Sequence, residues 1–212
     1  MIKHVFNRFS IAVCLLALAT LIPSLTVKGQ NDQGEIFISS GNGNSNKKSK
    51  VSVQPLLTFS DHAVIPGGGS ILVRNGEGVY MSLHSFGLTP GTVATAWFVF
   101  FNNPKKCATS PCGAPDVTNP DVEASVVNAT GRVVSADGTA DFGAFKAVGD
   151  TTGAVFGPGL LNAKKAEIRL VVRTHGPAIL EDPAILMQQL SMFNGGCPPN
   201  TCADLQVSIH QP

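Results

Sequence analysis

The segment from Thr92 to Asn102 places the strongest constraint on the fold of this chain, because it contains the run Ala-Trp-Phe-Val-Phe-Phe. Successive side chains of a β-strand point to opposite faces of the sheet. Trp97 and Phe101 would therefore lie on one face, and Phe98 and Phe100 on the other. A strand that is apolar on both faces must be covered on both sides, which predicts a central strand in a layered β domain.

Turn residues and alternating strands precede this segment. Ile71–Arg74 and Glu77–Phe86 flank Asn75-Gly76, a pair that readily adopts the positive φ angles of a tight hairpin turn. Thr89-Pro90-Gly91 then places Pro and Gly where a type II turn prefers them, directly before Thr92–Asn102. The pattern predicts a three-stranded antiparallel meander.

The second half of the chain has the same pattern of turn residues between short alternating segments. A further hairpin is predicted where Asp137-Gly138 separates Gly131–Ala136 from Thr139–Phe145. Apolar and polar residues then alternate in Glu167–Arg173 and in Leu205–His210, which predicts two half-buried strands. In the last strand Gln206, Ser208 and His210 form the polar face.

One helix is predicted near the carboxyl end. Asp182 can cap it, Pro183 suits its first turn, and Gly195 can end it. Its apolar face would contain Leu186, Leu190 and Phe193. Some eight strands with one short late helix predict an all-β fold: a Greek-key β-sandwich, immunoglobulin-like or copper–zinc superoxide dismutase-like, or a small barrel.

The amino terminus is typical of an export signal. Lys3 and Arg8 precede the apolar run Ile11–Ile22, and small residues precede Gln30, which predicts a signal peptide over residues 1–29. The run is shorter than the roughly 20 residues needed to span a bilayer, so we expect no stable membrane insertion after cleavage. The protein is then periplasmic or extracellular.

Residues 30–50 are polar and irregular, and residues 51–212 form the predicted β domain. The first part reads as a flexible leader, because it buries too little apolar surface to offset its ordering entropy. A short edge strand can form within it at Glu35–Ser39.

The first 29 residues hold three of the 15 basic residues and none of the 14 acidic ones, so the remainder has a net charge of −2. That balance argues against a nucleic-acid partner, since such proteins concentrate Lys and Arg on one face.

Four cysteines remain after the signal peptide, in two pairs with four residues between partners: Cys107 with Cys112, and Cys197 with Cys202. Sequence alone permits three pairings of four cysteines. Both intervening loops are rich in turn residues and can bring the two Cα atoms within the separation that a bridge requires, which favours the local pairing. An exported chain also favours disulfides over free thiols. A zinc site made of the four thiolates is the alternative.

Three histidines lie in or just beyond predicted strands: His84, His175 and His210. Three imidazoles suffice for copper or zinc, so a metal site at the rim of the domain is one hypothesis. The alternation places His84 and His210 on the polar faces of their strands, and His175 has the parity of Arg173. The other interpretation is that these are surface or hydrogen-bonded histidines without a ligand.

No catalytic constellation is recognisable in the sequence, and we predict no catalytic or cofactor-binding residue. Gly67-Gly-Gly-Ser70 lacks the Gly-x-Ser-x-Gly frame of a nucleophile elbow. The first hypothesis is therefore a non-enzymatic binding or structural module. The alternatives are a periplasmic copper- or zinc-binding protein and a hydrolase with an unrecognised site.

Several segments together resemble a family of exported bacterial proteins that carry no assigned function. They are Gly87–Gly91, Ala96–Pro104, Arg169–Pro177 and Phe193–Cys202. The resemblance runs from about Ile71 to the carboxyl end, and it implies a bacterial periplasmic or extracellular setting.

Asn75–Gly78, the long strand, Gly87-Leu-Thr-Pro and a later strand that ends in histidine are also similar to the chordin-type domain. That resemblance implies a sandwich akin to copper–zinc superoxide dismutase. The chordin-type domain usually has a His-x-His pair after the Gly-Leu-Thr segment, whereas this chain has Ala96-Trp-Phe98 there. The departure removes the support for a metal role carried over from that domain.

Overall fold

The structure is a computed structural model that describes residues 26–30, 36–39 and 49–212. The apolar run Ile11–Ile22 of the expected signal peptide and most of the polar leader lie outside the described residues. Among the described residues, no helix is long and apolar enough to cross a membrane.

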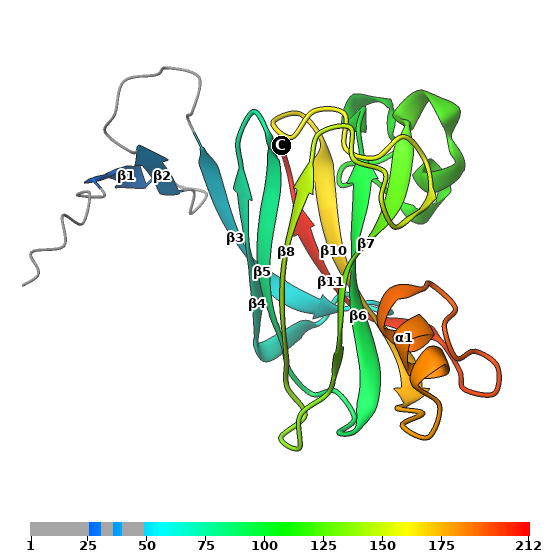
Figure 1. The fold of residues 1–212 in the computed structure, drawn as a ribbon. Helices are drawn as coiled ribbons and strands as arrows, with labels where there is room; N and C mark the ends of the chain where they lie inside the picture. Colours follow the sequence, from blue (N-terminus) through cyan, green and yellow to red (C-terminus); the bar gives the residue numbers. More distant parts are fainter. Residues whose placement is uncertain (1–25, 31–35, 40–48) are drawn as a thin grey trace, which may run out of the picture.

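One antiparallel sheet holds most of the described chain (Figure 1). Its strands are β3 Lys50–Thr58, β4 Val64–Arg74, β5 Gly78–Ser85, β6 Thr92–Phe101, β7 Ala124–Val133, β8 Ala140–Ala147, β9 Ala154–Phe156, β10 Glu167–Pro177 and β11 Ala203–His210. They are ordered β8-β5-β4-β3-β11-β10-β6-β7-β9. Two short strands, β1 (Thr26–Gln30) and β2 (Ile36–Ser39), pair with each other, and Ile36 of β2 pairs with Val51 of β3.

The sheet curls so that its inner face encloses the main apolar core. β7 and β8, from opposite halves of the strand order, come close together, and Arg132 Nε donates to the carbonyl oxygen of Asp141 at 3.2 Å. Buried side chains from β3 to β8 and from β10 fill the interior, among them Leu72, Met81 and Phe98. The prediction of a mostly β chain with one helix is confirmed. The strands form one continuous curled sheet rather than two separate ones.

The single α-helix of the described chain, α1, spans Pro183–Ser191. The Asp182 carboxylate accepts from the backbone N–H groups of Ala184 and Ile185, so the predicted cap is confirmed. The helix ends before Gly195, which instead folds back against its last turn. A Cβ at Gly195 would lie 1.9 Å from the carbonyl oxygen of Gln188, so only glycine fits this contact.

The hairpin at Asn75-Gly76 is confirmed, with Arg74 opposite Val79 and the N–H of Asn75 donating to Gly78 at 3.0 Å. The predicted meander is wrong at its third strand. β6 pairs with β10 and β7 and not with β5, whose free edge is taken by β8. With apolar side chains on both faces, β6 is most stable where both of its edges and both of its faces are covered.

The predicted second hairpin is also wrong, although its turn forms. Gly138 N–H donates to the carbonyl oxygen of Ser135 at 3.0 Å. The flanking strands do not form a ladder with each other, because β7 pairs with β6 and β8 pairs with β5. The turn therefore carries the chain from one half of the sheet to the other and helps to close the curl.

β11 turns its polar side chains toward the interior. Gln206, Ser208 and His210 are at most 4% exposed, so the polar face that alternation identified is the inner face of this strand. β11 pairs with β3 at only two positions, Gln206 with Thr58 and Val207 with Leu57. The rest of this seam has no β-ladder and needs other contacts.

Side-chain hydrogen bonds connect the two sides of the seam. His210 Nδ1 lies 2.7 Å from Ser52 Oγ, and His210 Nε2 lies 2.8 Å from Ser70 Oγ. Ser70 Oγ is also 2.6 Å from Ser208 Oγ. Arg74 Nη2 donates to the carbonyl oxygen of His210 at 2.8 Å. These bonds take the place of the missing ladder and satisfy polar groups that would otherwise be buried without partners.

The buried ring of His210 predicts a specific loss of stability in acid. Burial, reinforced by the positive charge of Arg74, lowers the pKa of His210 from 6.5 to about 3. The unfolded chain therefore binds a proton below pH 6.5 that the folded chain excludes, and stability present above pH 6.5 is lost as the pH falls toward 3. The His210 contribution has a slope of about 1.4 kcal/mol per pH unit in that window.

Urea unfolding of the wild type, His210→Gln and the exposed-site control His84→Gln between pH 7.5 and 4 measures this contribution. We expect His210→Gln to be less stable at pH 7.5 and to have a flatter pH dependence than the other two proteins. Equal slopes for the wild type and His210→Gln would contradict the assignment.

Candidate functional site

The outer face of β6 and β10 is the most distinctive surface of the domain. It carries Trp97, Val99 and Phe101 from β6 beside Arg169 and Val171 from β10. Two irregular segments lie over it, one toward each end (Figure 1). The first contains η1 (Pro104–Lys106), η2 (Ala114–Thr118) and η3 (Pro120–Val122), and the second contains α1 and the loop before β11.

The two segments leave an apolar groove of about 240 Å³ between them. Its floor is the outer face of β6 and β10, and its sides come from the two segments together with Phe59, Val126 of β7 and Phe156 of β9. Most of its lining is apolar. The lining residues are Phe59, Trp97, Val99, Phe101, Gly113, Ala114, Val117, Val126, Phe156, Arg169, Val171, Phe193 and Asp204.

A disulfide and buried carboxylates fix the first wall. Cys107 and Cys112 are bonded, with Cα atoms 5.3 Å apart, as the sequence predicted. Both oxygens of Glu167 lie 3.1 Å from the N–H of Cys112, and burial raises the pKa of Glu167. Asp116 accepts from the N–H groups of Ala108 and Gly113, which lowers the pKa of Asp116. The bond from Glu167 therefore attaches the wall to β10, and the disulfide and the Asp116 bonds hold the parts of the wall together.

Arg173 holds the second wall against the sheet. Its Nε donates to the carbonyl oxygen of Phe193 at 2.8 Å and its Nη2 to Asn194 Oδ1 at 3.3 Å, both in the second segment. Its Nη1 donates to Asp204 Oδ1 of the neighbouring strand β11 at 2.6 Å, which fixes the guanidinium on the sheet. Its guanidinium carbon lies 4.0 Å from the centre of the Phe193 ring, and that ring meets Trp97 edge to face at 5.2 Å. The alternation of the sequence placed Arg173 on the polar face of its strand. In the structure this residue attaches the second segment to the sheet.

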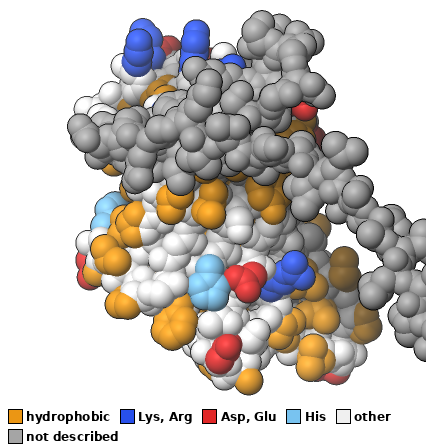
Figure 2. All heavy atoms as spheres, turned by 90° about the vertical axis from the view of Figure 1, so that its left-hand side faces the viewer, with side chains coloured by type: hydrophobic (Ala, Val, Ile, Leu, Met, Phe, Trp, Pro, Cys, Tyr) orange, Lys and Arg blue, Asp and Glu red, His pale blue; other side chains and the backbone are white. Residues whose placement is uncertain are grey.

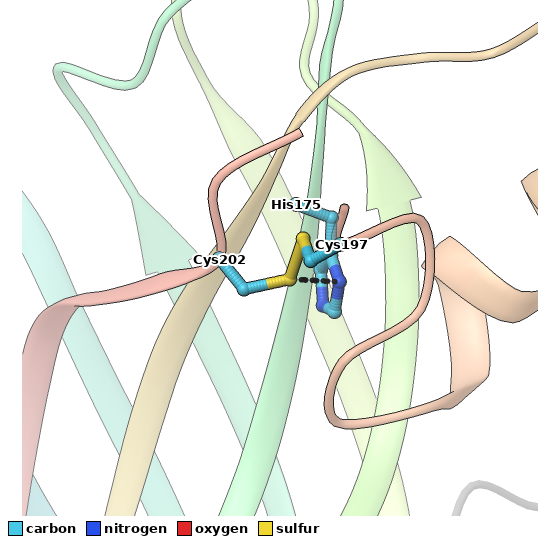
Figure 3. Close-up of side chains that lie close together, drawn as sticks. All are labelled: His175, Cys197 and Cys202. Atoms are coloured by element: carbon cyan, nitrogen blue, oxygen red, sulfur yellow. Dashed lines mark hydrogen bonds between the residues drawn. A yellow bond between two sulfur atoms is a disulfide. The ribbon is translucent and has the colours of Figure 1, made fainter. Parts of the chain in front are cut away.

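His175 lies beneath the second disulfide (Figure 3). Cys197 and Cys202 are bonded, which confirms the predicted local pairing. His175 Nδ1 lies 2.9 Å from the carbonyl oxygen of Gly195, and its Nε2 lies 2.8 Å from Thr95 Oγ1. A carbonyl only accepts, so Nδ1 carries the proton. Burial lowers the pKa of His175, which keeps the ring neutral.

The three histidines of the metal hypothesis have different surroundings. His84 is exposed, and its Nδ1 lies 2.7 Å from Asp141 Oδ1. His175 is buried on the outer face of the sheet, and His210 is buried on the inner face. Within the described chain, the three do not form a group with ligand atoms inside 4.8 Å of one another. His175 forms such a group with Cys197 and Cys202 instead.

A second apolar surface lies on the opposite half of the sheet, which faces the viewer in Figure 2. It includes Val53 and Ile71, which pair across β3 and β4 and are 51% and 43% exposed. Both side chains are exposed, and neither is part of the groove lining. The surface provides positions for control substitutions.

Only part of the groove could be found from the sequence. The alternation around Trp97 predicted an apolar strand face that needs a cover. Nothing in the sequence indicated that Val117, Phe156 and Phe193 converge on that face, because they come from segments that the fold alone brings together.

The comparisons with known proteins gave no match: no family model, curated protein or solved structure is similar to this chain at a significant level. The function therefore has to be inferred from the geometry of the groove and the residues around it.

Replacing Arg173 tests whether it holds the second wall. We expect Arg173→Met to lower the free energy of unfolding by about 2 kcal/mol, because Asp204 and the Phe193 carbonyl lose their charged donor. The emission of Trp97, the single tryptophan of the chain, should move to longer wavelength as Phe193 leaves its ring. The control is Lys164→Met, which removes an exposed cation outside both segments. Emission and stability equal to those of the control would refute the docking role.

Proposed function

We propose that this protein is an exported, non-enzymatic binding module whose groove receives an apolar side chain of a protein partner. The observation that carries the proposal is the apolar groove on the outer face of β6 and β10, bounded by two segments that each contain a disulfide. The argument for the type of ligand comes from the size, the charge and the stiffness of that groove.

The size favours a side chain over a whole small molecule. Sites for drug-sized ligands enclose roughly 300–1,000 Å³. The groove, at about 240 Å³, is smaller than that range. Protein interfaces often concentrate their binding energy in one aromatic or aliphatic anchor that fills such a pocket. An anchor of this kind matches the volume and the apolar lining.

The charges in the groove are compensated within the chain. Arg169 Nε lies 3.4 Å from Glu167 Oε1, and its guanidinium lies 5.3 Å from the centre of the Phe101 ring. Asp204 is bonded to Arg173. An anion or a cation in the groove would compete with these pairs, so an uncharged apolar group is favoured.

The disulfides make the walls stiff. On the chain-entropy model each small loop restricts the unfolded chain by roughly 2 kcal/mol. More important for binding, walls that are already ordered lose little entropy when a partner docks. Disulfides also suit an oxidising compartment, which agrees with the export signal that the sequence predicts.

A hydrolase is disfavoured by the surroundings of His210, the one histidine of the described chain with serine hydroxyls at both ring nitrogens. Ser70 and His210 have the spacing of a nucleophile and a base. However, both are buried in the interior, at 4% and 0% exposure. In a catalytic triad the other ring nitrogen of the histidine contacts a carboxylate. His210 Nδ1 contacts the hydroxyl of Ser52 instead.

A side-chain surrogate tests the groove directly. N-acetyl-phenylalaninamide should change the emission of Trp97 in a saturable way, with a Kd of roughly 1 mM. Val99→Phe fills the floor of the groove and should weaken this binding at least tenfold. Val53→Phe adds the same ring to the exposed sheet face outside the groove and should leave the binding of N-acetyl-phenylalaninamide unchanged. A signal that does not saturate, or equal binding by both variants, would exclude the groove as the site.

A further inference from the structure

We propose that reduction of the Cys197–Cys202 disulfide creates a binding site for one Cu(I) ion, with the two thiolates and His175 Nδ1 as ligands. The site lies where the loop before β11 passes His175 of β10 (Figure 3). It does not depend on what the groove binds, because its ligands are not part of the groove lining.

The three ligand atoms already lie close together. The Nδ1 atom of His175 and the Sγ atoms of Cys197 and Cys202 are all within 4.8 Å of one another. Cys202 Sγ lies 3.4 Å from His175 Nδ1. His175 is buried, while both cysteines are half-buried, so a reductant and an ion can approach from the cysteine side.

The loop is anchored by contacts that do not involve sulfur. Asn200, which lies between the two cysteines, donates through Nδ2 to the carbonyl oxygens of His175 and Pro177, both at 2.8 Å. The two bonds from Asn200 attach the loop to β10 without using sulfur, so they can hold it over His175 after the disulfide has opened, and the thiols stay near the ring. Gln189 donates to the same carbonyl of Pro177 at 2.9 Å, which ties α1 to this part of β10.

The contacts of the ring also support metal binding. Moving the proton from Nδ1 to Nε2 frees the Nδ1 lone pair and gives up the present bond from Nδ1–H to the carbonyl oxygen of Gly195, so a metal ion takes the place of that carbonyl at Nδ1. Nε2–H can then donate to Thr95 Oγ1, which is already 2.8 Å away. Such a bond from the distal nitrogen is the usual support of a metal-bound histidine. Thr95 in turn accepts from Trp97 Nε1 at 2.7 Å, which connects the site to a fluorescent reporter.

The redox step is balanced by a dithiol reductant. The dithiol gives up two electrons and two protons and closes to its cyclic disulfide, while the Cys197–Cys202 bond opens to two thiols. Binding of Cu(I) then releases the two thiol protons and forms two Cu–S bonds and one Cu–N bond. In the oxidised protein the sulfur atoms are bonded to each other and the site is closed.

The ligand set favours Cu(I) over other ions. Thiolates select soft ions, and structural zinc requires four ligands, whereas this cluster supplies three. The first disulfide has a different neighbour. Cys107 and Cys112 lie near Asp116, a hard oxygen ligand that already accepts two backbone N–H groups. The second pair is therefore the copper site.

The test uses full-length protein that carries Cys14→Ala, so that no thiol outside the two pairs is present, reduced anaerobically with a dithiol and desalted. A Cys107→Ala/Cys112→Ala variant removes the thiols of the first pair, and circular dichroism checks that it is folded. Titration with Cu(I) against the colorimetric chelator bicinchoninate should show one bound ion in this variant, and X-ray absorption should show two Cu–S bonds and one Cu–N bond.

Further variants separate the proposed site from simple thiol binding. Cys197→Ala/Cys202→Ala should lose the bound ion, and His175→Gln should lower the affinity at least tenfold, whereas His84→Gln should not. Nitrogen-15 NMR of folded, copper-loaded protein should show the His175 proton on Nε2. Unchanged affinity in His175→Gln, a proton that stays on Nδ1, or failure to compete with bicinchoninate would overturn the proposal.

Discussion

The structure depends on one constraint: β6 is apolar on both of its faces. Its inner face, with Phe98 and Phe100, is buried in the main core of the curled sheet. Its outer face, with Trp97 and Phe101, needs a second cover, and the two disulfide-containing segments supply it. They do not meet, so part of that face remains as a groove. The candidate site is thus the part of the outer face of β6 that the two segments leave uncovered.

Polar residues hold the two disulfide-containing segments in place on the outer face of the sheet. Glu167, Arg173 and His175 all lie on the outer face of β10, and each bonds to the backbone or side chains of one of the two segments. All three are buried, because the segments that they hold also shield them from water. The interior of the sheet uses the same principle, since Ser70 and His210 bond across the seam where β3 and β11 have no ladder.

Local features of the fold followed from the sequence, and long-range ones did not. The hairpin at Asn75-Gly76, the Asp182 cap and the two disulfide pairings depend on residues close together in the chain, and all are confirmed. The pairing of β5 with β8 and of β6 with β10 joins distant segments, and alternation cannot choose between such partners. Alternation also identified the polar face of β11 but could not show that His210 points inward.

The most direct measurement is a set of intermolecular nuclear Overhauser effects between methyl-labelled protein and an aromatic side-chain surrogate. The account predicts contacts from the surrogate ring to the methyl groups of Val99, Val117 and Val171, which line the groove, and none to Val53 or Ile71 on the open face of the sheet. Contacts of equal strength to both sets, or to the open face alone, would show that the groove is not a binding site.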